Sequence, residues 1–132
     1  MKTIEVSDGP IVEIISAYAA SVPSLASIAS SGTWTTIGAF YLSVDVAAKL
    51  EAIGLVSAAP ITLQVRLYNL TDAVAVSGSV TPDITTTTDV RKLSGALLLS
   101  GGKLYQIQAQ AFGGTGKTGT VRSAQLLASG SA

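Results

Sequence analysis

Short runs of β-forming residues alternate with turn residues from Ile61 to Leu127, and this alternation constrains the fold more than any other feature of the chain. The turn residues are Gly, Asn-Asp and Ser-Gly groups, which favour turns because they tolerate positive φ angles or hydrogen-bond to their own backbone. Several short strands separated by such turns are typical of a sandwich or barrel. The sequence therefore predicts an all-β protein, an antiparallel β-sandwich.

Two segments show the strict alternation expected of strands with one buried face. From Ile61 to Tyr68 (ITLQVRLY) every second residue is aliphatic, so one face would meet the core and the other would meet solvent or a partner. From Lys103 to Phe112 (KLYQIQAQAF) Tyr, Ile and Ala alternate with Leu and three glutamines. Glutamine amides can hydrogen-bond across an interface without the desolvation cost of charge. The three glutamines are Gln106, Gln108 and Gln110.

The segment between residues 33 and 54 is expected to hold a strand followed by a helix. Thr33 to Val46 is rich in β-formers and would be a strand region, broken at Gly38. Ala47 to Ile53 (AAKLEAI) favours helix because Ala, Lys, Leu and Glu are good helix formers, and Gly54 can end it. We therefore expect at most one short helix, near residues 46–54, crossing an open end of the sandwich. The buried face of the preceding strand is expected to consist of Phe40, Leu42, Val44 and Val46.

The remaining segments are assigned from turn residues and β-formers. Pro82 bars a central strand, and the Gly pair at Gly101 and Gly102 supplies the positive φ angles of a hairpin turn. The expected elements are a turn at Asn69–Asp72, a strand at Ala73–Val80, a polar connection at Thr81–Asp89, strands at Val90–Ser100 and Thr120–Ala128, a hairpin turn at Ser100–Gly102 and a glycine-rich loop at Gly113–Gly119.

A chain of 132 residues fits one domain, which can bury about two thirds of its extended surface without disulfides. We expect a single β-sandwich domain over residues 1–132, with its core at 33–128 and an N-terminal arm or edge strands at 1–30. Residues 11–30 are apolar enough to resemble a signal or membrane segment, but Glu13 and Pro23 interrupt them. No membrane segment is therefore expected.

The composition lacks the residues from which most active sites are built. The chain has no His and no Cys, so the commonest metal ligand, the commonest general base and thiol chemistry are absent. Eight acidic residues balance eight basic ones and only 12% of residues are charged, which gives no electrostatic footprint for nucleic acid or acidic lipid. The acids are scattered and form no calcium-loop motif. We expect a non-enzymatic protein without a cofactor or metal, and without nucleic-acid or membrane partners.

One motif resembles a nucleotide-binding loop. Ala111 to Thr118 reads AFGGTGKT, a loosened Walker A pattern with Ala in place of the first Gly. That motif holds phosphates only when a helix follows the loop and presents its N-terminal amides. Here Gly119 and a predicted strand follow instead. We therefore interpret the segment as a glycine-rich hairpin loop with Lys117 at a solvated tip.

Aromatic residues on predicted strands leave two interpretations open. Trp34, Tyr41, Tyr68 and Tyr105 could form a carbohydrate platform, because aromatic faces stack on sugar rings. Aromatic side chains on strands also serve as core or interface anchors. The residues expected to form an interface or to contact a glycan are Trp34, Tyr68, Gln106, Gln108 and Gln110.

Three short motifs carry a resemblance to a known group of proteins. They are R-L-Y-N-x-T-D at Arg66–Asp72, G-x-K-x-Y at Gly101–Tyr105 and R-x-A-x-L at Arg122–Leu126. In this succession, residues 33–128 resemble the small jelly-roll-like sandwich domains of tailed-phage virion proteins. The first thirty residues have no counterpart in the resemblance.

The resemblance implies a structural protein of the virion, most simply a head decoration (cement) protein, or else a tail or fibre component. Its partners would be the major capsid protein or other virion subunits, and it would be a symmetric homo-oligomer, with a trimer favoured. Low charge and abundant small residues suit repeated, wet interfaces. The alternative is a carbohydrate- or receptor-binding sandwich module, with a glycan as ligand.

Overall fold

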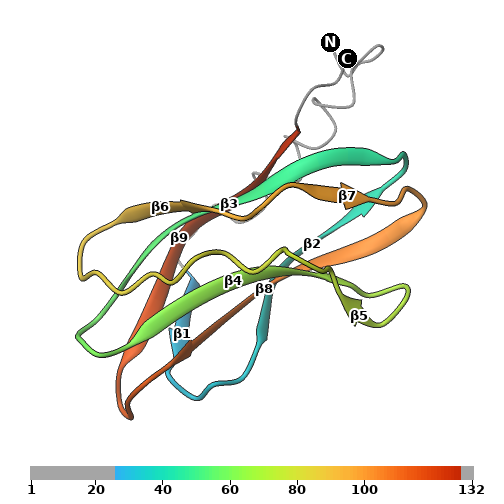
Figure 1. The fold of residues 1–132 in the computed structure, drawn as a ribbon. Helices are drawn as coiled ribbons and strands as arrows, with labels where there is room; N and C mark the ends of the chain where they lie inside the picture. The colour runs from blue at the N-terminus through green and yellow to red at the C-terminus, as the bar shows by residue number, and fades with distance from the viewer. Residues whose placement is uncertain (1–25, 129–132) are drawn as a thin grey trace.

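The computed structural model describes residues 26–128 as two antiparallel sheets packed face to face (Figure 1). Sheet A has the strand order β1-β9-β3-β6, with β7 also paired to β3, and sheet B has the order β2-β8-β4-β5. No helix occurs in this part of the chain, and the predicted all-β sandwich is confirmed. The strands are β1 Ala26–Ala29, β2 Thr35–Leu42, β3 Val46–Val56, β4 Thr62–Asn69, β5 Val74–Ala75, β6 Val90–Leu93, β7 Leu97–Leu99, β8 Lys103–Phe112 and β9 Thr118–Ala128.

The strands pair in a nested pattern. The first strand, β1, pairs with the last, β9; β2 pairs with β8; β3 pairs with both β6 and β7; and β4 pairs with β5. The chain is thus one long double ribbon whose successive pairs lie alternately in sheet A and sheet B. This is a jelly roll, as the resemblance implied. Of the expected N-terminal arm or edge strands at 1–30, only the end is described, and it forms β1; residues 1–25 lie outside the described part of the chain.

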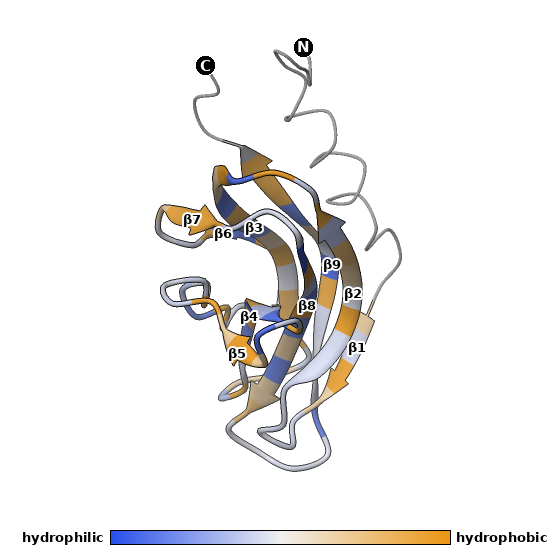
Figure 2. Ribbon diagram, turned by 90° about the vertical axis from the view of Figure 1, so that its right-hand side faces the viewer, coloured by the Kyte–Doolittle hydropathy of each residue, from blue (hydrophilic) through white to orange (hydrophobic). Residues whose placement is uncertain are grey.

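The core lies between the two sheets and follows the predicted alternation. The aliphatic residues of β4 and the Tyr, Ile and Ala residues of β8 are buried, and hydrophobic and hydrophilic residues alternate along the long strands in Figure 2. At Leu63 the sheets come close together, because Gly54 and Gly119 of sheet A lie opposite it. A Cβ added at Gly119 would lie 2.9 Å from Leu63 Cδ1, and one added at Gly54 would lie 2.5 Å from the Thr120 carbonyl oxygen. These two glycines let the leucine side chain fill the space between the sheets.

The predicted helix at Ala47–Ile53 is wrong. The segment lies within β3, which pairs with β9 along one side and with β6 and β7 along the other. Every second residue of it, such as Leu50 and Ala52, is buried in the core. Pairing on both sides and burial with period two override the helix preference of Ala, Lys, Leu and Glu, which is a weak local term.

The end of the strand region at Thr33–Val46 also differs from the prediction. The break expected at Gly38 is present as a register shift between Thr36 and Gly38. Phe40 and Leu42 are buried in sheet B, as expected, but Val44 lies in the following loop and is 38% exposed. Val46 belongs to β3 and packs against the core from sheet A. The strand ends because the chain crosses to the other sheet.

The strand predicted at Ala73–Val80 forms only as the short β5. Beyond β5 no strand among residues 26–128 pairs with this edge of β4, and side-chain hydroxyl groups accept hydrogen bonds from its backbone amides instead. The Leu67 amide donates to Ser79 Oγ at 3.0 Å, and the Val65 amide donates to Thr81 Oγ1 at 3.1 Å. Both hydroxyl residues are buried. The predicted turn at Asn69–Asp72 is confirmed, since the Asp72 amide donates to Asn69 Oδ1 at 2.9 Å.

Three further assignments are corrected by the topology. The predicted strand at Val90–Ser100 is two strands, β6 and β7, separated where the Leu50 amide donates to Ser94 Oγ at 2.9 Å. The links at Ser100–Gly102 and Gly113–Gly119 are not hairpins, because each joins strands of different sheets. Glycine-rich turns look alike in sequence whether they connect neighbours in one sheet or cross between sheets.

Candidate functional site

The five residues predicted as interface or glycan contacts all lie on the outer face of sheet B. Gln106, Gln108 and Gln110 alternate along β8 with core residues and therefore lie on the outer face, where Gln108 is only 8% exposed. Tyr68 does the same on the neighbouring strand β4, where it lies opposite Gln106. Trp34 comes directly before β2 and reaches the same face. The fold thus gathers residues from three strands onto one surface.

At the centre of this face is Arg66, which the sequence reasoning did not single out. Its guanidinium carbon lies 4.2 Å from the centre of the Trp34 ring and 5.6 Å from the centre of the Tyr68 ring. Its Nε donates to Gln108 Oε1 at 2.9 Å. We call Trp34, Arg66, Tyr68 and Gln108 the Arg66 cluster. The only sequence signal for it was a cation two residues before Tyr68, on the same face of one strand.

A network of amide hydrogen bonds extends on both sides of the Arg66 cluster. Gln106 Oε1 accepts from Thr36 Oγ1 at 3.1 Å and from Gln108 Nε2 at 3.2 Å. Gln110 Nε2 donates to Gln64 Oε1 at 2.9 Å, and Gln64 Nε2 donates to Asp83 Oδ1 at 2.7 Å. These contacts hold long side chains in place before any partner binds. Less conformational entropy is then lost on binding.

The charge of Arg66 is not balanced by an acid within the described residues. The ion pairs there join Arg91 to Glu51, Lys103 to Asp72 and Arg122 to Asp89. Burial lowers the pKa of the Arg66 guanidinium, and Tyr68 acts in the opposite direction. An arginine nevertheless remains charged at neutral pH.

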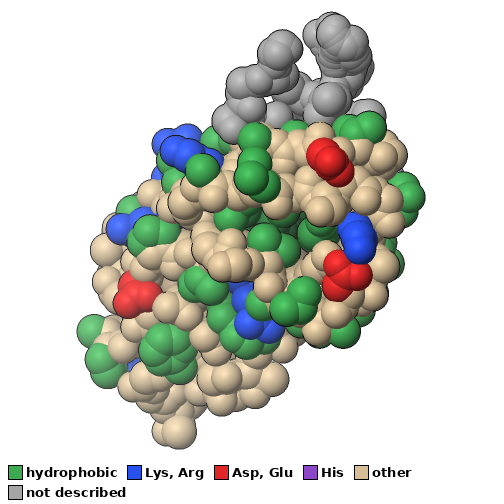
Figure 3. Space-filling model, turned by 45° about the vertical axis from the view of Figure 1, so that its right-hand side comes forward, with side chains coloured by type: hydrophobic (Ala, Val, Ile, Leu, Met, Phe, Trp, Pro, Cys, Tyr) green, Lys and Arg blue, Asp and Glu red, His purple; other side chains and the backbone are tan. Residues whose placement is uncertain are grey.

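Charges elsewhere are dispersed. On the face drawn in Figure 3, acidic and basic side chains are scattered and form no continuous patch of either sign. This surface therefore offers no broad electrostatic footprint for a polyanion.

The outer face of sheet A differs from that of sheet B. Glu51, on the central strand β3, is only 5% exposed, and it accepts hydrogen bonds from Arg91 Nε and from Gln125 Nε2. Leu98 of β7 is 88% exposed. This face pairs its buried acid internally, and Leu98 is the most exposed large apolar side chain among residues 26–128.

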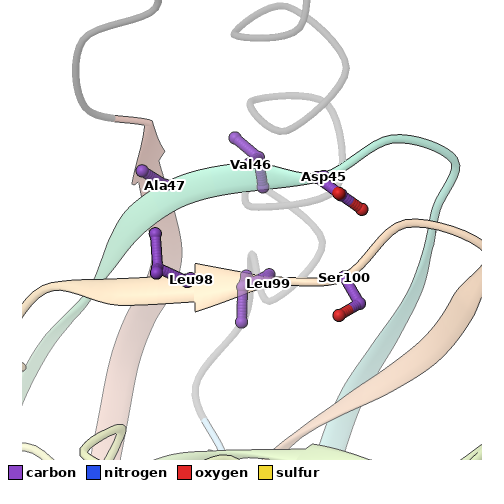
Figure 4. A pocket seen from close by; sticks show the side chains of 6 residues that line it. All are labelled: Asp45, Val46, Ala47, Leu98, Leu99 and Ser100. Atoms are coloured by element: carbon purple, nitrogen blue, oxygen red, sulfur yellow. The ribbon is translucent and has the colours of Figure 1, made fainter.

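An open hollow of about 320 Å³ lies beside Leu98, between the start of β3 and β7 (Figure 4). Its lining has one ionisable group, Asp45, whose Oδ1 already accepts from the Gly101 amide at 2.7 Å. A ligand site normally presents several convergent polar groups. This hollow presents only the hydroxyl of Ser100 and a carboxylate that already accepts a backbone hydrogen bond, so it is not a candidate site. Its lining residues are Asp45, Val46, Ala47, Leu98, Leu99 and Ser100.

Two of the four predicted platform aromatics do not join the Arg66 cluster. Tyr105 is 2% exposed, stacks on Phe40 with ring centres 5.6 Å apart and donates its hydroxyl to the Ser100 carbonyl at 2.9 Å. It is a core residue, so its place in a carbohydrate platform is wrong. Tyr41 is 52% exposed on β2, beside Leu104 of β8. It lies on the outer face of sheet B, and within residues 26–128 no ring contact or hydrogen bond joins it to the Arg66 cluster.

The Walker-like segment does not have phosphate-binding geometry. The loop is followed by β9 instead of a helix, so no helical N-terminus from the described part of the chain faces it. Lys117 is half-buried, not a fully solvated tip, and its carbonyl accepts from the Ser30 amide at 3.0 Å. Within residues 26–128 no group of three or more acids could hold a metal ion. In the same range no helix is long and apolar enough to cross a membrane.

Comparison with known proteins adds no family assignment. The sequence matches no family model, and it matches no curated protein. What is known of the molecule therefore comes from its jelly-roll fold and from the outer face of sheet B.

Proposed function

We propose that the protein is a non-enzymatic structural component of a virion, and that it is a decoration (cement) protein stabilising an assembled capsid shell. The observation that carries the proposal is the outer face of sheet B, where a hydrogen-bonded glutamine network surrounds an arginine that contacts two aromatic rings. Arg, Trp and Tyr are the residues most enriched at the energetic centres of protein interfaces. The choice of a capsid or other virion subunit as the partner follows from the resemblance to phage virion sandwich domains.

The proposed mechanism is linkage to assembly. A protein that binds the assembled shell better than its separate subunits shifts the equilibrium towards the shell by mass action. The pre-ordered amides of Gln106, Gln108 and Gln110 suit a wet interface of many shared hydrogen bonds. A closed trimer would place three such faces around one symmetry axis of the shell.

The test is co-sedimentation of the purified chain with assembled, expanded shells and, separately, with dissociated shell protein. We expect saturable binding to the shells and at least tenfold weaker binding to the subunits. Equal affinity for both forms would overturn the decoration role. The molar mass of the free chain, measured by light scattering, adds the oligomeric state, for which a trimer is expected.

The second candidate is a glycan- or receptor-binding module, which the presence of Trp34 and Tyr68 on one face favours. One face of the Trp34 ring is occupied by the Arg66 guanidinium, however, and is closed to a sugar. A screen against a broad glycan array separates the two candidates. Binding that is lost in both Trp34→Ala and Tyr68→Ala, with the fold intact, would support the glycan module instead of the decoration protein.

A further inference from the structure

Arg66 differs from the other arginines that the structure describes. Arg91 and Arg122 each contact a carboxylate of the same chain, Glu51 and Asp89 respectively. Arg66 makes no ion pair in the same range of residues, and yet it is half-buried at the middle of a sheet face. A partly desolvated cation without a counter-charge is costly unless something else binds it.

The guanidinium is also held in a defined orientation. The Trp34 and Tyr68 rings lie 4.2 and 5.6 Å from its central carbon, and Gln108 Oε1 accepts from Nε at 2.9 Å. Aromatic rings attract a guanidinium through their faces but do not neutralise it. The side chain is thus held by one hydrogen bond and two aromatic contacts before any ligand arrives.

The remaining nitrogens of the guanidinium are available. The protein hydrogen bond in this cluster uses Nε, and none within residues 26–128 uses the two terminal nitrogens. Asp83, the acid that joins this face, accepts instead from Gln64 Nε2 at 2.7 Å. Two terminal N–H groups in one plane match the two oxygens of a carboxylate.

We propose that the Arg66 cluster is a carboxylate-binding site. Its occupant is an Asp or Glu side chain of the capsid shell protein to which the decoration protein binds. The inference rests on the proposed function, because it names the chemistry by which that partner is recognised. A protein side chain is favoured over an acidic sugar because the guanidinium covers the Trp34 face on which a sugar ring would stack. The amides of Gln106 and Gln110 on either side suit the polar backbone next to such a side chain.

Trp34 provides a direct readout, because it is the single tryptophan of the chain and lies against Arg66. The full chain is titrated with the blocked peptide acetyl-Ala-Glu-Ala-amide at constant ionic strength, and Trp34 emission is recorded. The matched neutral peptide has Gln in place of Glu. We expect a saturable emission change in the millimolar range with the Glu peptide and none with the Gln peptide. The chemical shift of the Arg66 Nε–H group, followed by NMR, is a second readout of the same event.

Three variants identify the group responsible. Arg66→Gln should abolish the response, and Arg66→Lys should weaken it at least fivefold, because a lysine keeps the charge but loses the planar pair of donors. Arg122→Gln, which changes an exposed arginine of sheet A, should leave the response unchanged. A response that survives in Arg66→Gln would overturn the assignment.

A parallel titration with N-acetylneuraminic acid tests the other source of a carboxylate. A response to this sugar but not to the Glu peptide would overturn the protein partner and move the site to the glycan alternative. No change in either readout with either ligand would overturn the carboxylate site itself. Shell binding by the wild-type chain in that last case would show that the decoration role stands without the Arg66 site, so the two failures are distinguishable.

Discussion

The two sheets share one inner layer but have outer faces of different character. On sheet A, the buried Glu51 is matched by Arg91 and Gln125 of the same chain. On sheet B, Arg66 is held by two aromatic rings and one glutamine and meets no acid among the described residues. Removing one partner of a buried, internally balanced pair destabilises the fold, whereas an ordered charge that is left unbalanced is available to a partner. We therefore propose that the charge pairing on sheet A serves the fold and that the outer face of sheet B serves recognition.

The largest expected effect is on the free energy of unfolding, and it comes from the core layer between the two sheets. Leu63→Ala removes a fully buried side chain that packs against Gly119, and we expect the free energy of unfolding to fall by about 2–5 kcal/mol. Leu98→Ala is the matched control, because that leucine is 88% exposed; its effect should stay within about 0.5 kcal/mol. Urea unfolding curves measure both variants. Similar losses in the two would mean that the layer between the sheets is not the core.

The second effect tests the balanced charge on sheet A. Arg91→Met leaves the Glu51 carboxylate, whose side chain is 7% exposed, without its cation, and we expect a loss of about 1–3 kcal/mol in the free energy of unfolding. Arg122→Met breaks the exposed pair with Asp89 and should cost less than about 1 kcal/mol. Urea midpoints of the two variants compare them directly. If Arg122→Met proves the more harmful, the structural role given to Glu51 is wrong.

The third effect should appear in binding more than in stability. Arg66→Gln removes the contacts with Trp34 and Tyr68, which lie at the surface, so we expect a loss of about 1 kcal/mol in the free energy of unfolding. Its binding to assembled shells should fall at least tenfold, which corresponds to about 1.4 kcal/mol. Arg91→Met, although less stable, should bind like the wild type at temperatures where it is folded. Loss of shell binding in Arg91→Met with full binding in Arg66→Gln would reverse the comparison.

The smallest expected effect is a pH dependence of the free energy of unfolding, which arises from a tyrosine in the core between the two sheets. Burial raises the pKa of Tyr105, and its hydrogen bond with the Ser100 backbone only partly opposes this. Because the folded state holds the phenol proton more tightly than the unfolded state, the contribution to stability is full below pH of about 10 and is lost as the pH rises through the folded-state value. Tyr105→Phe should remove this decline. Thermal melts between neutral and alkaline pH would show equal slopes for the two proteins if the effect is absent.

The alternation of buried and outward residues along single strands could be predicted from the sequence. The pairing of one strand with another could not. Leu63 and Leu67 were placed in the core because burial with period two is a local pattern. The segment Ala47–Ile53 was assigned to a helix because its residues favour one locally, while its pairing with β9 and β6 is set by distant parts of the chain. Long-range pairing decided that element against its local preference.

The candidate site shows the same division. The outward positions of the β8 glutamines and of the half-buried Tyr68 followed from alternation. The meeting of Trp34 with Arg66 did not, because the two residues belong to segments that sheet B brings together across β8. A sequence pattern shows to which face of the sheet a side chain points. It does not show which side chain from another strand of the sheet lies beside it.

Oxidative footprinting of the chain, free and bound to assembled shells, tests most directly whether recognition belongs to sheet B. The probes are Trp34 and Tyr41 on sheet B, of which Tyr41 is 52% exposed, and Leu98 on sheet A, which is 88% exposed. We expect Trp34 and Tyr41 to be protected on the shell while Leu98 reacts as in the free chain. Protection of Leu98 with unchanged Trp34 and Tyr41 would contradict the assignment and place the interface on sheet A.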